Sequence, residues 1–248
     1  LGFTHLALEA LTYERLEGDA CRNSVAKDSG LHERGHALRD TGAYTNDPIY
    51  AELVRMALAE GYRLVAYDHT YPDPKSPQRE EDQANNIHCI LKDDPNARVV
   101  VIGGGGHTSK SPNTSMEGGM MGLRLAERLD PDPYSIAVQS VRLVNVPEGA
   151  GEGALLDPGT DGALAGQPYF AETTEGLYAP AGYDASVFYA LPEDRSADAG
   201  WLRLGGWRIP APAVPLACGN APCLLEARRA GESADAVPGD RCVIAEAG

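Results

Sequence analysis

Apolar and polar positions alternate along residues 1–146 in a pattern that predicts strands and helices in turn. Apolar runs predict buried strands at residues 3–8, 63–67 and 98–102. Apolar positions at helical spacing predict helices that begin near residues 11, 47, 79 and 120. Another strand is expected within 134–146. Such alternation predicts an α/β fold with a largely parallel central sheet and flanking helices.

The predicted strand at 98–102 has the most distinctive surroundings. Its run from Val99 to Ile102 is continuously apolar, which is typical of a strand covered on both faces. Four glycines, 103–106, follow the strand and lead directly into His107. Glycine lets the backbone turn sharply and leaves space around a neighbouring side chain. We therefore expect His107 to be partly exposed in a pocket.

Beyond residue 146 the pattern changes. Residues 147–184 are rich in Gly, Ala and Pro and predict long loops. Short strands are predicted at 186–191, 224–228 and 241–245, and a hairpin at 201–209 around Gly205-Gly206. We expect a β-rich C-terminal part with long loops. The 248 residues are predicted to form a single domain, in which 147–248 completes or extends the sheet of 1–146.

Charge and hydropathy narrow the classes of partner. The chain has 36 acidic and 21 basic residues and a net charge of −15. This argues against nucleic acid and anionic membrane surfaces, because both require a cationic face. No apolar run approaches the roughly 20 residues of a membrane-spanning helix, so we expect no transmembrane segment. The sequence leaves the oligomeric state open.

The cysteines bear on the cellular compartment. Cys218 and Cys223 flank a turn-like spacer that could bring their sulfurs together, which predicts a local disulfide; two reduced thiols are the alternative. The chain begins with Leu1, inside a predicted strand, as after a cleaved signal peptide, a truncation or a disordered start. Both features favour an extracytoplasmic location, periplasmic or secreted, and leave the cytoplasm open.

Three predicted strands end in polar side chains. Glu9 follows the first, Asp68 and His69 the second, and His107 the third. The carboxyl ends of parallel strands meet at one edge of a sheet, where ligands bind. A carboxylate and a histidine there suit acid–base catalysis or a divalent metal. The plainer alternative is that the histidines are ordinary loop residues and that Glu9 caps a helix.

Arg79 adds a guanidinium to the same predicted edge. Its fork could hold a carboxylate or a phosphate. We expect Glu9, Arg79 and His107 to be catalytic, with their side-chain ends within about 10 Å. Tyr67, His69 and Glu80 are the expected substrate contacts. The alternative for Arg79 and Glu80 is that they only begin a helix. The glycine run has neither the dinucleotide-binding nor the P-loop spacing, and no G-x-S-x-G elbow occurs.

These motifs together resemble a known superfamily. A strand ending in Glu9 precedes Arg79-Glu80-x-x-Gln83-Ala84-x-Asn86-Ile87, and a further strand leads to Gly104-x-x-His107. This order resembles the superfamily of erythromycin esterases, TraB/PrgY proteins, Tiki proteases and haem-binding ChaN proteins. The stretches Tyr44-Thr-x-Asp47-Pro48 and 132–136 are similar to those of uncharacterised bacterial members. The resemblance covers residues 1–146.

The resemblance implies a hydrolase of small-molecule or peptide substrates. His107 and Glu9 would activate water, directly or as ligands of a divalent metal, and Arg79 would hold the substrate or its developing oxyanion. The alternatives are a haem- or metal-binding protein like ChaN, and a catalytically silent member. A haem reading would use Tyr67, Tyr71, Met120 and Met121. The superfamily carries an earlier G-x-x-H histidine, which we expect upstream of Leu1.

Overall fold

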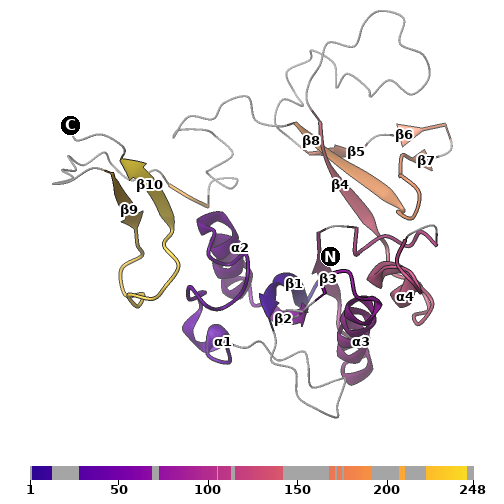
Figure 1. Cartoon of the computed structure of the whole chain (residues 1–248), viewed down its shortest axis with the longest axis horizontal. Coiled ribbons are helices and arrows are strands. Elements are labelled where there is room, and N and C mark those ends of the chain that lie inside the picture. The colour runs from indigo at the N-terminus through magenta and orange to yellow at the C-terminus, as the bar shows by residue number, and fades with distance from the viewer. Residues whose placement is uncertain are drawn as a thin grey trace, which may run out of the picture.

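The computed structural model in Figure 1 describes ten segments of the chain. They are residues 2–12, 28–68, 73–104, 106–112, 115–141, 168–170, 172–174, 176–190, 207–209 and 222–244. All structural statements below concern these segments.

A parallel sheet of three strands lies at the centre of the N-terminal part. Its strand order is β2 (Arg63–Asp68), β1 (His5–Thr12) and β3 (Val99–Ile102). The registers place His5 beside both Arg63 and Val99, so the amino ends of all three strands lie at one edge. The predicted α/β class with a parallel central sheet is confirmed at this level.

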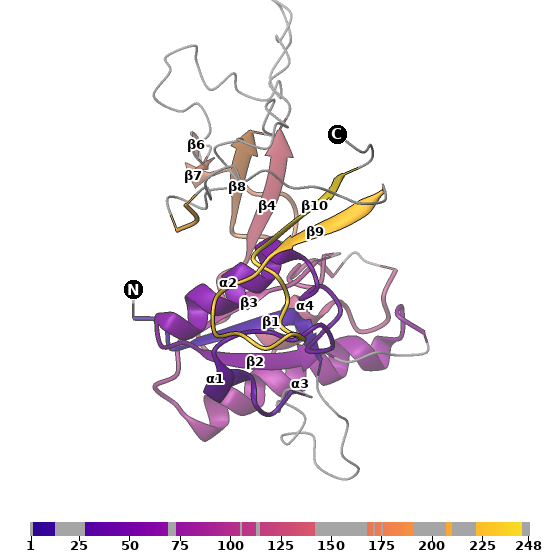
Figure 2. The same cartoon turned by 90° about the vertical axis from the view of Figure 1, so that its left-hand side faces the viewer.

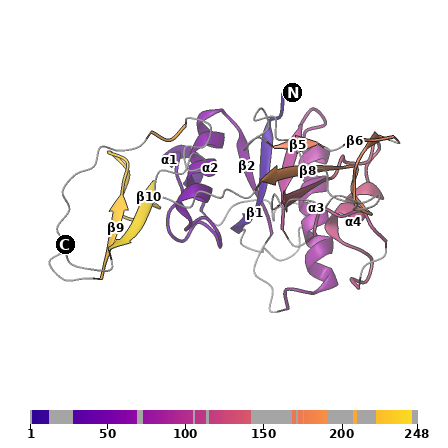
Figure 3. The ribbon, with the colours of Figure 1, turned by 90° about the horizontal axis from the view of Figure 1, so that it is seen from above.

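Helices cover both faces of this sheet, as the view in Figure 3 shows. Alternate residues of a strand point to opposite faces. Leu8 and Leu64 pack in the cluster beneath α2 (Pro48–Ala59) and α1 (Leu31–Arg34). Ala7, Val65 and Tyr67 pack in a second cluster with residues of α3 (Pro77–Asp93) and α4 (Met121–Ala126). The two clusters form a core of three layers, helix, sheet and helix.

Side-chain caps set where the two long helices begin. The Asp47 carboxylate accepts hydrogen bonds from the amides of Ile49 and Tyr50, as the Asp-Pro pattern predicts. Ser76 caps α3 in the same way and is followed by Pro77, so α3 begins two residues before Arg79. This start leaves Arg79 and Glu80 in the first turn of α3, next to the carboxyl ends of the strands.

Two predictions about the strands were wrong. Strand β1 continues to Thr12, so Glu9 lies inside the strand and no helix begins at Leu11. The pairing of β1 with β2 shifts between Leu8 and Thr12, which keeps the longer strand in the sheet. Strand β3 is only half-buried, and Ile102 is 40% exposed, so its apolar run is not covered on both faces as predicted.

The later strands pair among themselves within the described residues. Strand β4 (Ile136–Val141) runs parallel to β8 (Ala185–Ala190), and the two lie side by side in Figure 2. The other pairings are antiparallel: β5 (Tyr169–Phe170) with β8, β6 (Glu172–Thr173) with β7 (Gly176–Leu177), and β9 (Cys223–Ala227) with β10 (Asp240–Ile244). The strands predicted near 186–191, 224–228 and 241–245 are confirmed. The single domain stays a prediction.

The C-terminal segments are held to α2 by a buried carboxylate. Glu52 accepts hydrogen bonds from the Trp207 indole at 2.6 Å and from Arg55 at 3.2 Å, and it pairs with Arg229. Arg55 also pairs with Glu232 at 2.7 Å. Of the predicted 201–209 hairpin only 207–209 is described, and these three residues form no strand.

Cys223 is disulfide-bonded, as is Cys89, whereas Cys242 is a free, exposed thiol. Cys218 lies outside the described residues, so its pairing with Cys223 stays a prediction. None of the helices in the described segments has the length and apolar character required to cross a membrane.

Candidate functional site

The carboxyl edge of the central sheet carries a cluster of charged side chains. Arg79 donates to both oxygens of Asp68, from Nε at 3.1 Å and from Nη2 at 2.5 Å. The same Nη2 donates to Glu9 Oε1 at 3.0 Å. Arg79 is thus the cation that joins a carboxylate of β1 to one of β2. The hydrogen bond that Arg79 donates to Asp68 is the main cause that raises the pKa of Arg79, and Glu9 adds to it.

His107 lies between two glutamates. Its Nε2 is 3.6 Å from Glu9 Oε1, and its Nδ1 is 2.7 Å from Glu80 Oε1. This close approach does not have the geometry of a hydrogen bond. The Glu80 Oε1 and His107 Nδ1 atoms are both buried, and neither has a hydrogen-bond partner among the described residues. At 2.7 Å the two atoms are nonetheless close enough for a strong electrostatic interaction if the ring is protonated.

Glu80 is fixed from its other side. It is fully buried, and its Oε2 accepts the backbone amide of Met121, the first residue of α4, at 2.8 Å. A buried carboxylate needs such donors, since leaving it without them is costly. Glu80 therefore connects α3, α4 and the loop of His107. The expected substrate contact of Glu80 has no support in this position.

The glycine run packs closely against the cluster. A Cβ on Gly103 would lie 2.6 Å from the Tyr67 hydroxyl, and one on Gly104 would lie 3.3 Å from Glu9 Oε2. The Gly104 amide donates to that oxygen at 2.5 Å. The expectation that the glycines leave space around the neighbouring histidine is not met at Gly103 and Gly104. They approach the protein's own side chains rather than leaving open space.

Burial corrects two expectations. His107 is only 6% exposed and not partly open to a pocket, because Glu80 and the 103–104 turn enclose it. Tyr67 is fully buried and donates to the carbonyl of Ile102 at 3.0 Å, so it braces the turn after β3. Burial is also the main cause that raises its pKa. Its role as a substrate contact stays without support, and His69 lies outside the described residues.

The structure brings together the three predicted catalytic residues, Glu9, Arg79 and His107, within direct reach. Sequence reasoning placed Asp68 at the end of a strand but missed it as the main partner of Arg79. It also missed Tyr50, which lies near Glu9. Burial, with Glu9 contributing, raises the pKa of Tyr50 to about 12. The apolar spacing of α2 concealed this position, since Tyr50 also packs against the core.

The cluster does not fit a divalent metal. Glu9 already accepts from Arg79 with one oxygen and from Gly104 with the other, and the guanidinium occupies the place between the carboxylates. No group of three or more His, Cys, Asp or Glu side chains suited to a metal occurs in the described residues. Tyr67 does not suit a haem iron either, because its hydroxyl is buried and donates to the carbonyl of Ile102. Met121 is buried too, and Tyr71 lies outside the described residues.

Comparisons with protein-family models, curated proteins and solved structures found no match to this chain. The resemblance to the erythromycin esterase, TraB, Tiki and ChaN superfamily therefore stays a prediction.

Proposed function

We propose that the protein is a hydrolase in which His107 activates water beside Glu9. The observation that carries the proposal is that the His107 ring lies between the carboxylates of Glu80 and Glu9. A carboxylate lies 2.7 Å from Nδ1, and the opposite ring nitrogen faces a second carboxylate across 3.6 Å. A histidine oriented by a buried carboxylate is the usual construction of a general base.

In this proposal each residue has a separate task. Glu80 holds the His107 proton on Nδ1, which leaves the Nε2 lone pair free to take a proton from water. Glu9 accepts a hydrogen bond from the same water and orients it. Arg79 holds Glu9 in place through its Nη2 hydrogen bond. The Nη1 hydrogen that is not donated to the Pro74 carbonyl is available to an oxyanion. The proposed substrate is an ester or amide in a small molecule or peptide, the class that the resemblance implies.

A silent member of the superfamily is the second candidate, and one observation favours it. His107 is 6% exposed and Glu80 is fully buried, so a substrate would reach Nε2 only after local movement. In this case the cluster would serve as a buried ionic network that joins β1, β2, α3 and α4.

A substrate screen with matched variants tests the proposal. The full chain is assayed on p-nitrophenyl esters of increasing acyl length and on quenched fluorescent peptides. His107→Asn and Glu9→Gln should each lower kcat by about 100-fold or more, as expected for loss of a general base or its partner. His88→Asn and Glu33→Gln change the same residue types outside the cluster and should keep wild-type rates.

Two results would reject the hydrolase. One is turnover by His107→Asn at the wild-type rate, which would place the reaction elsewhere. The other is no turnover by a folded wild-type chain on either substrate class, which would support the silent member.

Location follows as a second proposal. We infer an extracytoplasmic protein, supported by the disulfide-bonded states of Cys89 and Cys223, since disulfides persist in oxidising compartments. Mass spectrometry of unreduced protein should find the peptide carrying Cys218 and Cys223 two daltons lighter than its dithiol form. Alkylation of both thiols without reduction would contradict the pairing.

A further inference from the structure

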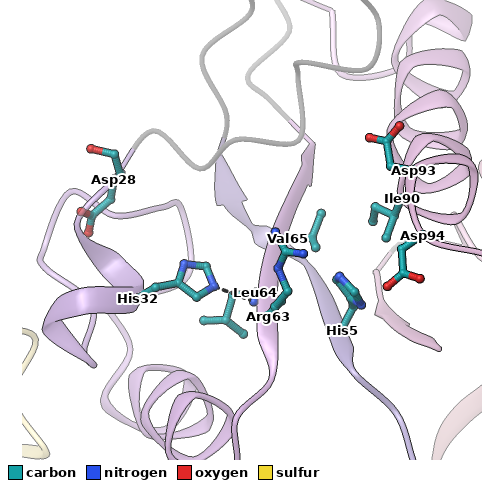
Figure 4. Close-up of a pocket in the computed structure, with 10 residues that line it drawn as sticks. His5, Asp28, His32, Arg63, Leu64, Val65, Ile90, Asp93 and Asp94 are labelled. Carbon is teal, nitrogen blue, oxygen red and sulfur yellow. Dashed lines mark hydrogen bonds between the residues drawn. The ribbon is translucent and has the colours of Figure 1, made fainter. Parts of the chain in front are cut away.

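A cavity of about 380 Å³ lies at the amino edge of the central sheet, opposite the cluster of Glu9 and His107. This volume is within the range of sites for small ligands. Its walls come from the starts of β1 and β2, from the region of α1, and from the end of α3. Figure 4 shows Arg63 between His32 and His5, with Asp93 and Asp94 on the side of α3.

The cation in this cavity is the guanidinium of Arg63. No described residue forms a hydrogen bond or ion pair with the guanidinium of Arg63, although three aspartates line the same cavity. Asp28 is engaged elsewhere, by Thr41 at 2.5 Å and by Arg34. An arginine that lines a cavity with all its side-chain donors free is suited to bind a carboxylate or a phosphate.

The opposite wall has the reverse charge. Asp93 is exposed and its carboxylate has no partner among the described residues. Among the described residues, the carboxylate of Asp94 accepts only the amide of Asn96, at 3.0 Å. Both residues lie at the C-terminal end of α3, a helix of 17 residues, where the helix dipole favours a positive charge. This wall therefore suits an ammonium group.

Two histidines also line the cavity, one on each side of Arg63. His32 Nε2 accepts the amide of Leu64 at 2.9 Å, which places the proton of the neutral ring on Nδ1 as a donor. His5 is 5% exposed and contacts the Thr4 hydroxyl at 2.8 Å. Burial, and then the charge of Arg63, lower the pKa of both rings. The lowered pKa favours the uncharged form of both rings, although the charge of Asp94 acts in the opposite direction on His5.

We propose that this cavity is a second binding site, separate from the hydrolase cluster, for a small zwitterion such as an amino acid. The anionic group binds Arg63, and the ammonium group binds Asp93 and Asp94. A ligand carrying both charges can pair with Arg63 and with the aspartates at the same time, whereas these side chains do not pair with each other. An anion alone would face the aspartates, and a cation alone would face Arg63.

Isothermal titration of the full chain with ligands of matched chain length tests this site. Glycine, β-alanine and 4-aminobutyrate vary the distance between the two charges. Each is compared with an amine and a carboxylate of the same chain length, for example butylamine and butyrate. We expect at least one amino acid to bind about tenfold more tightly than its matched amine and carboxylate, a difference of about 1.4 kcal/mol.

Three variants locate the binding. Arg63→Gln and Asp94→Asn should each weaken the best amino acid by about tenfold, since each removes one charge partner. Lys92→Gln removes a neighbouring exposed charge of α3 outside the cavity and should leave affinity unchanged. Equal binding of butylamine and 4-aminobutyrate would overturn the zwitterion. No binding of any of the three amino acids at about 10 mM, or binding indifferent to Arg63→Gln, would overturn the site.

Discussion

Two arginines mark the opposite edges of one parallel sheet. At the carboxyl edge, Arg79 donates to Asp68 and Glu9, and these side chains are at most 14% exposed. At the amino edge, Arg63 lines a cavity of about 380 Å³, and its guanidinium bonds to no described residue. The carboxylates that approach Arg79 most closely come from the strands themselves, whereas Asp93 and Asp94 come from the helix end across the cavity.

Arginine therefore serves a different purpose at each edge of the sheet. A guanidinium enclosed with its partners contributes to a rigid cluster, because removing either partner leaves a buried charge. A guanidinium left without partners in a cavity costs little to the fold and keeps its donors for a ligand. The first edge is therefore suited to hold a reactive histidine in place, and the second to bind a charged molecule.

The sharpest test compares the two arginines directly. Arg79→Gln should lower the free energy of unfolding by about 3 kcal/mol, since Asp68 and Glu9 lose the guanidinium that pairs with both in a mostly buried setting. Arg63→Gln should change it by no more than about 0.5 kcal/mol, as for an exposed residue without partners. Urea denaturation measures both. Similar losses for the two variants would contradict the contrast between the edges.

A second test concerns the packing of the carboxyl edge. Gly103→Ala should cost about 2 kcal/mol, because the new methyl group would meet the Tyr67 hydroxyl, whose side chain is buried and cannot swing away. Gly104→Ala, with a contact of 3.3 Å, should cost less. The double variant Gly103→Ala/Tyr67→Phe should recover part of the loss in thermal unfolding. At the amino edge, Ser29 lines the cavity, and Ser29→Ala should leave the free energy of unfolding unchanged.

A third and smaller effect is the pH dependence of the amino edge. Burial first, and Arg63 next, lower the pKa of His5 below its usual 6.5. As the pH falls through about 6.5 the unfolded chain takes up this proton before the folded one, so the free energy of unfolding decreases until the folded pKa is passed. His5→Gln should flatten this decrease, and His88→Gln should not.

Nuclear magnetic resonance titration of the His5 imidazole measures how neighbouring charges shift its pKa, independently of unfolding. Arg63→Gln should raise the pKa of His5, because it removes a positive neighbour, and Asp94→Asn should lower it further. An unchanged His5 titration in both variants would show that the cavity does not hold these charges near the ring.

Local pattern was sufficient for most of the N-terminal elements. The Asp47-Pro48 cap and the helical spacing after Arg79 occur as predicted, and the strands predicted at 63–67 and 98–102 occur within one residue of those bounds. Capping and periodicity depend on neighbours in the chain. The convergence of Glu9, Arg79 and His107 was also predictable. It follows from the rule that parallel strands present their carboxyl ends at one edge.

Only the tertiary structure decided how these residues are used. Whether β1 ends at Leu8 or at Thr12 depends on its pairing with β2, which no local pattern contains. The burial of His107 depends on Glu80 and on its bond to Met121, 41 residues further along the chain. The cavity around Arg63 arises where α3 ends opposite the start of β2. The sequence alone determined the chemistry of each side chain, whereas contacts between distant segments determined which charges are enclosed and which are left for a ligand.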